Sequence, residues 1–285
     1  MKTKENLRET AYFSIFRVSA FIGIGILFLT LILLFVSGYS VIDFNFLTKN
    51  WQHRDITQGG ILPAILGSFY LGFGVIAVSF PLGIGTAIFL TEYSKNNLLK
   101  RIIKLAIRNL SGVPSIVYGL FGLVIFVNLL SFGTSLLSAI LTLSFMTIPW
   151  IITASVESFE SVPQKFRESS LALGATHWQT TRKIVLPAAI TGSITGGIIG
   201  IARALGETAP LIMVGATFYL SNLPSSPLDK FMALPYHTFI LATQHSSPYA
   251  NTYAAATALV LITLTFLLSS GAIFLRFHYR RKKDW

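Results

Sequence analysis

Residues 109–156 read NLSGVPSIVYGLFGLVIFVNLLSFGTSLLSAILTLSFMTIPWIITASV and contain no charged side chain. A helix needs about 20 apolar residues to cross the hydrocarbon core of a membrane, so this stretch is long enough for two crossings. The run Ser-Phe-Gly-Thr-Ser at 131–135 divides it, which predicts helices near 115–130 and 136–156. The stretch therefore predicts an all-α, polytopic membrane protein.

The rest of the chain extends this pattern to about six transmembrane helices. Further apolar segments lie near 18–36 and 65–90, from Pro187 to about Tyr219, and near 253–275. Only 12% of the residues are charged, against about 25% in a soluble domain of ordinary composition. We interpret the first segment as an uncleaved helix, because its apolar run is longer than that of a signal peptide.

The basic residues indicate how the chain is oriented. Eighteen of the 22 Lys and Arg residues lie in the N-terminal segment, the 91–113 and 157–187 loops and the C-terminal tail, and three lie in the alternate loops. Such a bias predicts that the protein lies in the cytoplasmic membrane. Its basic loops and both termini are then on the cytoplasmic side. The net charge of +11 is thereby explained by topology, and we expect no nucleic-acid partner.

The sequence offers no chemistry for an enzyme. It has no cysteine, its five histidines are scattered, and no phosphate-binding loop or metalloprotease motif occurs. We therefore expect no catalytic residue, no metal and no cofactor bound by this chain itself.

Two segments outside the spans have distinct patterns. Residues 95–110 form a basic amphipathic pattern, which predicts a short helix at the cytoplasmic interface. The 220–252 loop is long and proline-rich, and it either dips back toward the pore or forms a short helix that meets an external partner. We divide the chain into an N-terminal segment with the first helix and external loop (1–60), a membrane core (61–276) and a basic tail (277–285).

An ion pair within the fifth apolar segment is the candidate site. A charged side chain at the centre of a membrane helix costs on the order of 3 kcal/mol, so such residues usually have a function. On a continuous helix, one arc of about 80° holds a glycine stripe and both charges. Its members are Gly192, Gly196, Gly200, Arg203 and Glu207. Glycines at this spacing let a second helix approach closely, so we expect the stripe to face protein or an aqueous cavity.

Two interpretations of this pair stay open. In one, Arg203 and Glu207 are a salt bridge that only packs helices. In the other, the guanidinium of Arg203 binds an anion that crosses the membrane, with Thr208 beside it in the path. Glu207 then either holds Arg203 or accepts a proton from the anion, which would favour hydrogen phosphate over sulfate.

The loop before this segment predicts a pair of short helices. The first begins near Ser161 and stops at Gly174, a residue type that commonly ends helices. The second begins at Thr176, where Gln179 completes a capping box, and ends before Pro187.

At these residues the sequence resembles the permeases of binding-protein-dependent ABC importers. Their loop signature is matched by Glu168-Ser169-Ser170, Gly174 and the Leu186-Pro187 end, although the family usually has Ala-Ala after the glutamate. Within that family the chain is similar to the PstA-like phosphate-uptake permeases. The matching blocks are 59–65 (GGILPAI), 112–122 (GVPSIVYGLFG), 171–176 (LALGAT) and 203–210 (RALGETAP).

The resemblance implies a type I importer fold and a set of partners. These are a second, PstC-like permease, two ATPase subunits that bind ATP and Mg, and an external phosphate-binding protein. It also implies that the Glu168–Gly174 loop docks on the ATPase and that Arg203 and Glu207 lie in the phosphate path. The alternatives are another oxyanion (molybdate, tungstate, sulfate or phosphonate), a proton-coupled secondary transporter, and a membrane scaffold without transport.

Overall fold

The structure is a computed structural model that describes residues 2–52, 55–220 and 223–281. These residues form helices and the loops that join them, so the predicted all-α class is confirmed. The α-helices are α1 (Lys2–Gly38), α2 (Phe44–Thr48), α3 (Leu62–Ile88), α4 (Leu98–Ser111), α5 (Ser115–Gly122), α6 (Leu136–Glu160), α7 (Gln164–Ala172), α8 (His177–Thr180), α9 (Leu186–Gly206), α10 (Ala209–Val214), α11 (Leu234–Thr243) and α12 (Ala250–Arg281). A 3-10 turn, η1 (Tyr39–Val41), follows α1, and three π-helical turns occur at η2 (Phe89–Tyr93), η3 (Leu123–Leu129) and η4 (Thr181–Val185).

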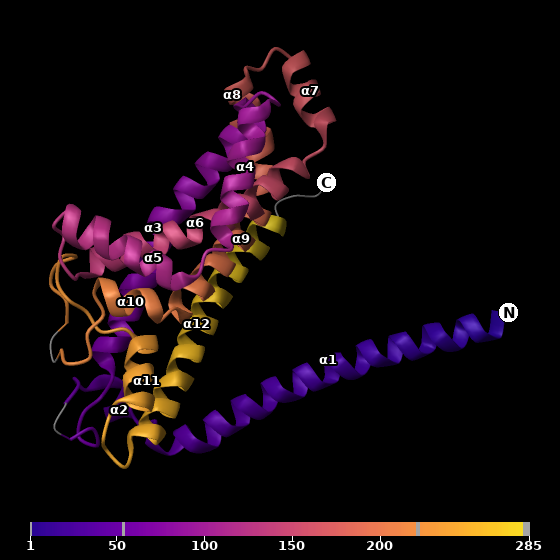
Figure 1. Cartoon of the computed structure of the whole chain (residues 1–285). Coiled ribbons are helices and arrows are strands. Elements are labelled where there is room, and N and C mark those ends of the chain that lie inside the picture. The colour runs from indigo at the N-terminus through magenta and orange to yellow at the C-terminus, as the bar shows by residue number, and fades with distance from the viewer. Residues whose placement is uncertain (1, 53–54, 221–222, 282–285) are drawn as a thin grey trace.

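Four long helices form the bundle. α3 and α9 both pack against α6, and α12 packs against α9 and α11 (Figure 1). Five helices in the described part of the chain are long and apolar enough to cross a membrane. A sixth crossing is available if α4 and the α5–η3 helix, which meet at an angle of 100°, form one bent span. The predicted span near 115–130 is thus the second helix of this bent pair.

The first helix stands apart from the bundle. α1 leaves it from the α2–α11 end and reaches the N-terminus far from the other helices (Figure 1). Its contact with α12 is close at Gly38, where a Cβ atom would lie 2.6 Å from the backbone nitrogen of Ala256. Most of α1 has no packing partner among the described residues of this chain.

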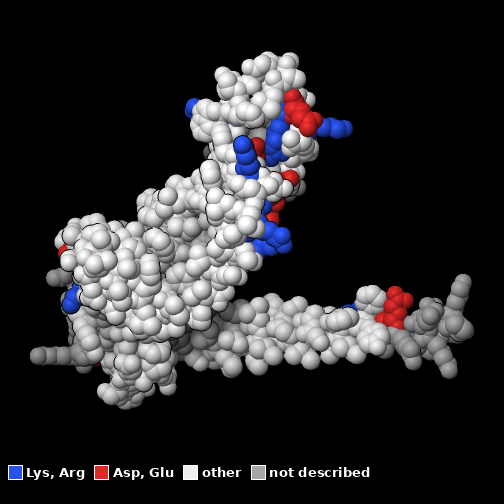
Figure 2. All heavy atoms as spheres, turned by 45° about the horizontal axis from the view of Figure 1, so that its top comes forward, with Lys and Arg blue, Asp and Glu red and all other residues white. Residues whose placement is uncertain are grey.

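Charged side chains gather at one end of the bundle. Figure 2 shows acidic and basic groups around α7 and α4, and a wide uncharged surface over much of the rest of the bundle. α4 is a helix as predicted, and the Asn97 side chain caps it by accepting from the backbone of Lys100. Ile103 and Ile107 of α4 pack toward α6, whereas Leu98 and Ile102 are exposed.

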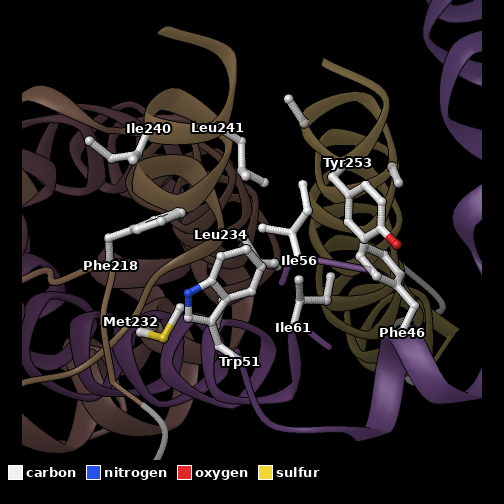
Figure 3. Packing of buried hydrophobic residues seen from close by; sticks show 13 residues of the cluster. Phe46, Trp51, Ile56, Ile61, Phe218, Met232, Leu234, Ile240, Leu241 and Tyr253 are labelled. Atoms are coloured by element: carbon white, nitrogen blue, oxygen red, sulfur yellow. The ribbon is translucent and has the colours of Figure 1, made fainter. Parts of the chain in front are cut away.

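The opposite end is closed by a compact apolar cluster. It joins α2, the loop that follows α2, α11 and the start of α12, with Trp51 at its centre (Figure 3). Trp51 lies edge-on against His237, with ring centroids 4.4 Å apart, and also contacts Phe218. The 220–252 loop therefore does form a short helix, α11, and that helix packs inward through Leu234, Ile240 and Leu241.

The fifth apolar segment differs from the sequence-based expectation at both ends. The helix does not stop before Pro187, because η4 joins α8 to α9 and Pro187 lies directly after this wide turn within one continuous helix. Nor does the helix continue to Tyr219, since α9 ends at Gly206. In a continuous helix the ring of Pro210 would clash with the carbonyl of Gly206, four residues earlier.

Candidate functional site

The glycine stripe of α9 lies against α6. A Cβ atom at Gly196 would lie 2.7 Å from the Cβ of Ala154, and one at Gly200 would lie 3.4 Å from Ile151. At Gly192 it would collide with Ser158, whose hydroxyl donates to the carbonyl of Ala189 across the interface. Small residues thus let the two helix backbones approach closely.

Arg203 continues this stripe one turn further and reaches the same neighbour. Its guanidinium carbon lies 4.9 Å from the centre of the Trp150 ring on α6, which is a cation–π contact. Its Nε lies 3.6 Å from the Oε1 atom of Glu207, a distance of ion pairing rather than hydrogen bonding. Two side chains therefore hold the guanidinium in place without using its N–H groups.

Glu207 is not on the helix, and the predicted common arc fails at this residue. It follows the last residue of α9 with extended backbone angles (φ −78°, ψ 132°). Thr208 comes next and precedes α10, which packs against α5 so closely that a Cβ at Gly119 would lie 2.9 Å from the Cα of Pro210. The stripe consists of the three glycines and Arg203, and the helix break brings Glu207 back to Arg203.

The donors of Arg203 are largely unused. Nε is buried and has no hydrogen-bond acceptor, and Arg203 donates no hydrogen bond to any residue that the structure describes. Its side chain is 36% exposed, whereas that of Glu207 is 16% exposed. A guanidinium carries five N–H donors in a planar fork, which is suited to an oxyanion. The arrangement can bind such an anion without first breaking hydrogen bonds.

The loop residues that resemble the importer signature form a helical hairpin. Glu168, Ser169 and Ser170 lie on α7, and Gly174 takes a positive φ of +85° that ends it. Thr176 and Gln179 form the predicted capping box at the start of α8. The hydroxyls of Ser170 and Thr180 lie 2.9 Å apart and join the two helices, and Leu186 and Pro187 open α9. Glu168 and Ser169 remain exposed.

Sequence reasoning missed several residues of these two regions. Trp150 follows Pro149 in an apolar run. It lies beside Arg203 because of the way α6 and α9 align, which the sequence does not show. Glu92 and Arg167 form an ion pair across 75 positions of the chain. Glu92 gave a faint signal, since it is an acidic residue directly at the end of an apolar segment.

Taken together, the structure shows an all-helical bundle with a charged pair at a helix break and a capped hairpin at one end. Residues 79–283 match the family model described as "Binding-protein-dependent transport system inner membrane component". The chain belongs to this family. It is a multi-pass inner-membrane permease subunit of an ABC importer, has no ATPase activity of its own, and works with ATPase subunits and a binding protein.

Individual relatives agree with this assignment. The chain is 33% identical to the probable ABC transporter permease protein YqgI of Bacillus subtilis, over 83% of this chain and 84% of the relative. It is 33% identical to the phosphate transport system permease protein PstC of Pasteurella multocida, over 77% and 76% of the two chains. It is 34% identical to PstA 2 of Mycobacterium bovis, a protein of the same description, over 74% and 68%.

The fold also matches a solved structure. A chain of the bacterial alginate ABC transporter, in complex with alginate pentasaccharide-bound periplasmic protein, superposes with a TM-score of 0.67 over 94% of each chain. The sequences are 15% identical, so the likeness concerns the fold. The predicted type I importer permease fold is confirmed.

Proposed function

We propose that this chain moves inorganic phosphate into the cell as one of two permeases of an ATP-driven importer. The observation that carries the proposal is Arg203, a partly enclosed guanidinium with unused donors at a helix break within the membrane bundle. Desolvating an anion in the membrane is costly, and a fixed fork of N–H donors offsets that cost. Thr208, next to Glu207, adds a hydroxyl to the proposed path.

Glu207 supplies a basis for choosing the anion. A carboxylate near Arg203 repels a fully ionised anion, whereas hydrogen phosphate can donate a hydrogen bond to that carboxylate through its P–OH group. This pairing favours phosphate over sulfate, which carries no proton near neutral pH. The names of two relatives, PstC and PstA 2, point to the same cargo.

The remaining parts of the importer follow from the family. In our proposal a second, PstC-like permease faces this chain, two ATPase subunits bind ATP and Mg, and an external protein delivers phosphate. The core spans 61–276, and both termini and the α7–α8 hairpin are cytoplasmic. Glu168, Ser169, Ser170 and Gly174 dock on the ATPase. ATP binding draws the hairpins together and opens the permeases outward, and hydrolysis reverses the motion.

Uptake by the reconstituted importer tests this proposal. Proteoliposomes that hold both permeases and the ATPase should accumulate radiolabelled phosphate only with ATP inside and the binding protein outside. Unlabelled phosphate should compete, and sulfate or molybdate should not. Failure to accumulate labelled phosphate, with ATP-dependent accumulation of labelled sulfate, molybdate, tungstate or a phosphonate, would assign the cargo to that anion instead. Because the chain belongs to a family of ABC importer permeases, we do not propose a secondary transporter or a membrane scaffold.

A further inference from the structure

A second arginine, Arg167 in α7 of the hairpin, connects several elements through its hydrogen bonds. Arg167 of α7 donates from Nε and NH2 to the two carboxylate oxygens of Glu92, at 3.0 and 2.8 Å. It also donates from NH1 to the carbonyl of Val162 at 2.6 Å and from NH2 to that of Phe159 at 2.8 Å. One guanidinium thus makes four hydrogen bonds, two of them in a bidentate ion pair.

These four bonds join three separate elements. Arg167 belongs to the hairpin, Glu92 lies in η2 at the end of α3, and Phe159 and Val162 mark the C-terminal end of α6. The side chains of Arg167 and Glu92 are only 14% and 9% exposed, so solvent screens the pair weakly. A cation at the C-terminal carbonyls of a helix also interacts favourably with the helix dipole.

The two anchored helices lead to the candidate anion site. α6 carries Trp150, which lies against the guanidinium of Arg203. α3 meets the end of α9 at Gly72, where a Cβ atom would lie 3.0 Å from the side chain of Leu205. A shift of α7 that is passed to α6 therefore reaches Trp150 beside Arg203, and one passed to α3 reaches the end of α9 at Leu205.

We propose that the Arg167–Glu92 pair is the positioning link that transmits movement of the ATPase-docked hairpin to α3 and α6. Neither residue touches the anion. This inference rests on the proposed function in one respect, namely that α7 docks on the ATPase. Without the link, the hairpin would move while the membrane helices lag, and ATP would be hydrolysed with little transport.

A matched control lies beside the link. Lys104 of α4 pairs with Glu160 at the end of α6, so it also joins two elements at this end of the bundle. Its side chains are 28% and 52% exposed, and exposed pairs contribute little. Neutralising Lys104 or Glu160 should leave the importer close to wild type.

The test measures ATP hydrolysed per anion transported. The complete importer is purified through a tag on the ATPase and reconstituted with Arg167→Gln, Glu92→Gln, the double variant, or Lys104→Gln. For either single variant at the link we expect intact assembly, hydrolysis within about threefold of wild type, and uptake lowered about tenfold or more, in the usual range of coupling between sites. The double variant should be no worse than Arg167→Gln, because its partner is already lost.

Each outcome of this test either supports or overturns a stated proposal. A wild-type ratio of hydrolysis to uptake in Arg167→Gln, or equal losses in Lys104→Gln, would overturn the link. If Arg167→Gln fails to assemble, Arg167→Lys keeps the charge and loses the fork, and a wild-type ratio in that variant would overturn it equally. Absence of phosphate uptake by the wild-type importer would count against the proposed cargo alone. The link is then tested with labelled sulfate, molybdate, tungstate or phosphonate, whichever the wild-type importer accumulates: Arg167→Gln should raise the ATP hydrolysed per anion, and Lys104→Gln should not.

Discussion

Arg203 and Arg167 each face a glutamate, and they differ in how their donors are used. Arg167 donates four hydrogen bonds, whereas Arg203 donates none to the described residues and is held by an aromatic ring and a carboxylate 3.6 Å away. A saturated guanidinium fixes elements to one another. An unsaturated one keeps its capacity for a ligand. The difference separates the proposed anion site from the proposed mechanical link.

The largest effect should come from removing the unused fork. In Arg203→Ala we expect phosphate uptake to fall about 100-fold, as for loss of a preorganised donor at a reacting anion, with assembly retained. Arg203→Lys keeps the charge without the fork and should also lose most uptake. The measurement is ATP-dependent uptake by the reconstituted importer. Uptake unchanged in Arg203→Lys would mean that charge alone suffices, and Arg101→Lys on the exposed face of α4 is the control.

The next effect concerns the partner carboxylates. Glu207→Gln should lower phosphate uptake about tenfold, the size expected for a charged hydrogen bond, and reduce the preference over sulfate. Glu92→Gln should lower uptake of any transported anion equally, because it acts at a distance. The two variants are compared by competition of sulfate against labelled phosphate. The contrast between the two regions breaks down if Glu92→Gln alters anion preference, or if Glu207→Gln does not.

Packing of the stripe that presents Arg203 gives a further effect. A side chain at Gly196 would meet Ala154, so Gly196→Val should push α9 from α6 and cost about 1–3 kcal/mol of stability. Gly271 of α12 has no atom within 4 Å of its would-be Cβ, and Gly271→Val is the control. Thermal unfolding of the purified importer would record the difference. Equal stability of the two variants would show that α6 and α9 are not closely packed.

A smaller effect should follow from the ring beside Arg203. Trp150→Phe keeps an aromatic face and should change uptake by about twofold, whereas Trp150→Leu removes it and should cost about fivefold. The fall should appear mainly in the anion concentration needed for half-maximal uptake, since the ring positions the guanidinium. A change confined to the rate at saturating anion would instead place Trp150 in the conformational step.

The smallest effect lies at the opposite end of the bundle. Burial among Trp51 and Phe218, together with nearby His245, lowers the pKa of His237 to about 3 from an ordinary value of 6.5. The folded chain thus stays unprotonated there while the unfolded chain gains a proton below pH 6.5. Folding should lose on the order of 2 kcal/mol between pH 7.5 and pH 5. The loss should be absent in His237→Phe; an equal fall in that variant would assign it to other groups.

The sequence predicted those features that depend on local or one-dimensional signals. Uncharged runs located the membrane helices, and Thr176 with Gln179 located the start of α8, because hydropathy and capping act over a few residues. The break at Glu207 was missed although Pro210 signalled it, since the helical arc assumed one continuous helix. Trp150 beside Arg203 and Glu92 beside Arg167 depend on how distant helices meet, which no local pattern specifies.

The π turn η4 joins α8, the second helix of the hairpin, to α9, the helix that carries Arg203. Residues His177–Gly206 form a single 30-residue helix, about 45 Å long, that runs from the capping box to the turn after Arg203. Deleting one residue within Thr181–Val185 would shorten the wide turn and swing Arg203 by about 100° around the axis, away from Trp150. The number of residues in η4 therefore sets the direction in which Arg203 points around the helix axis.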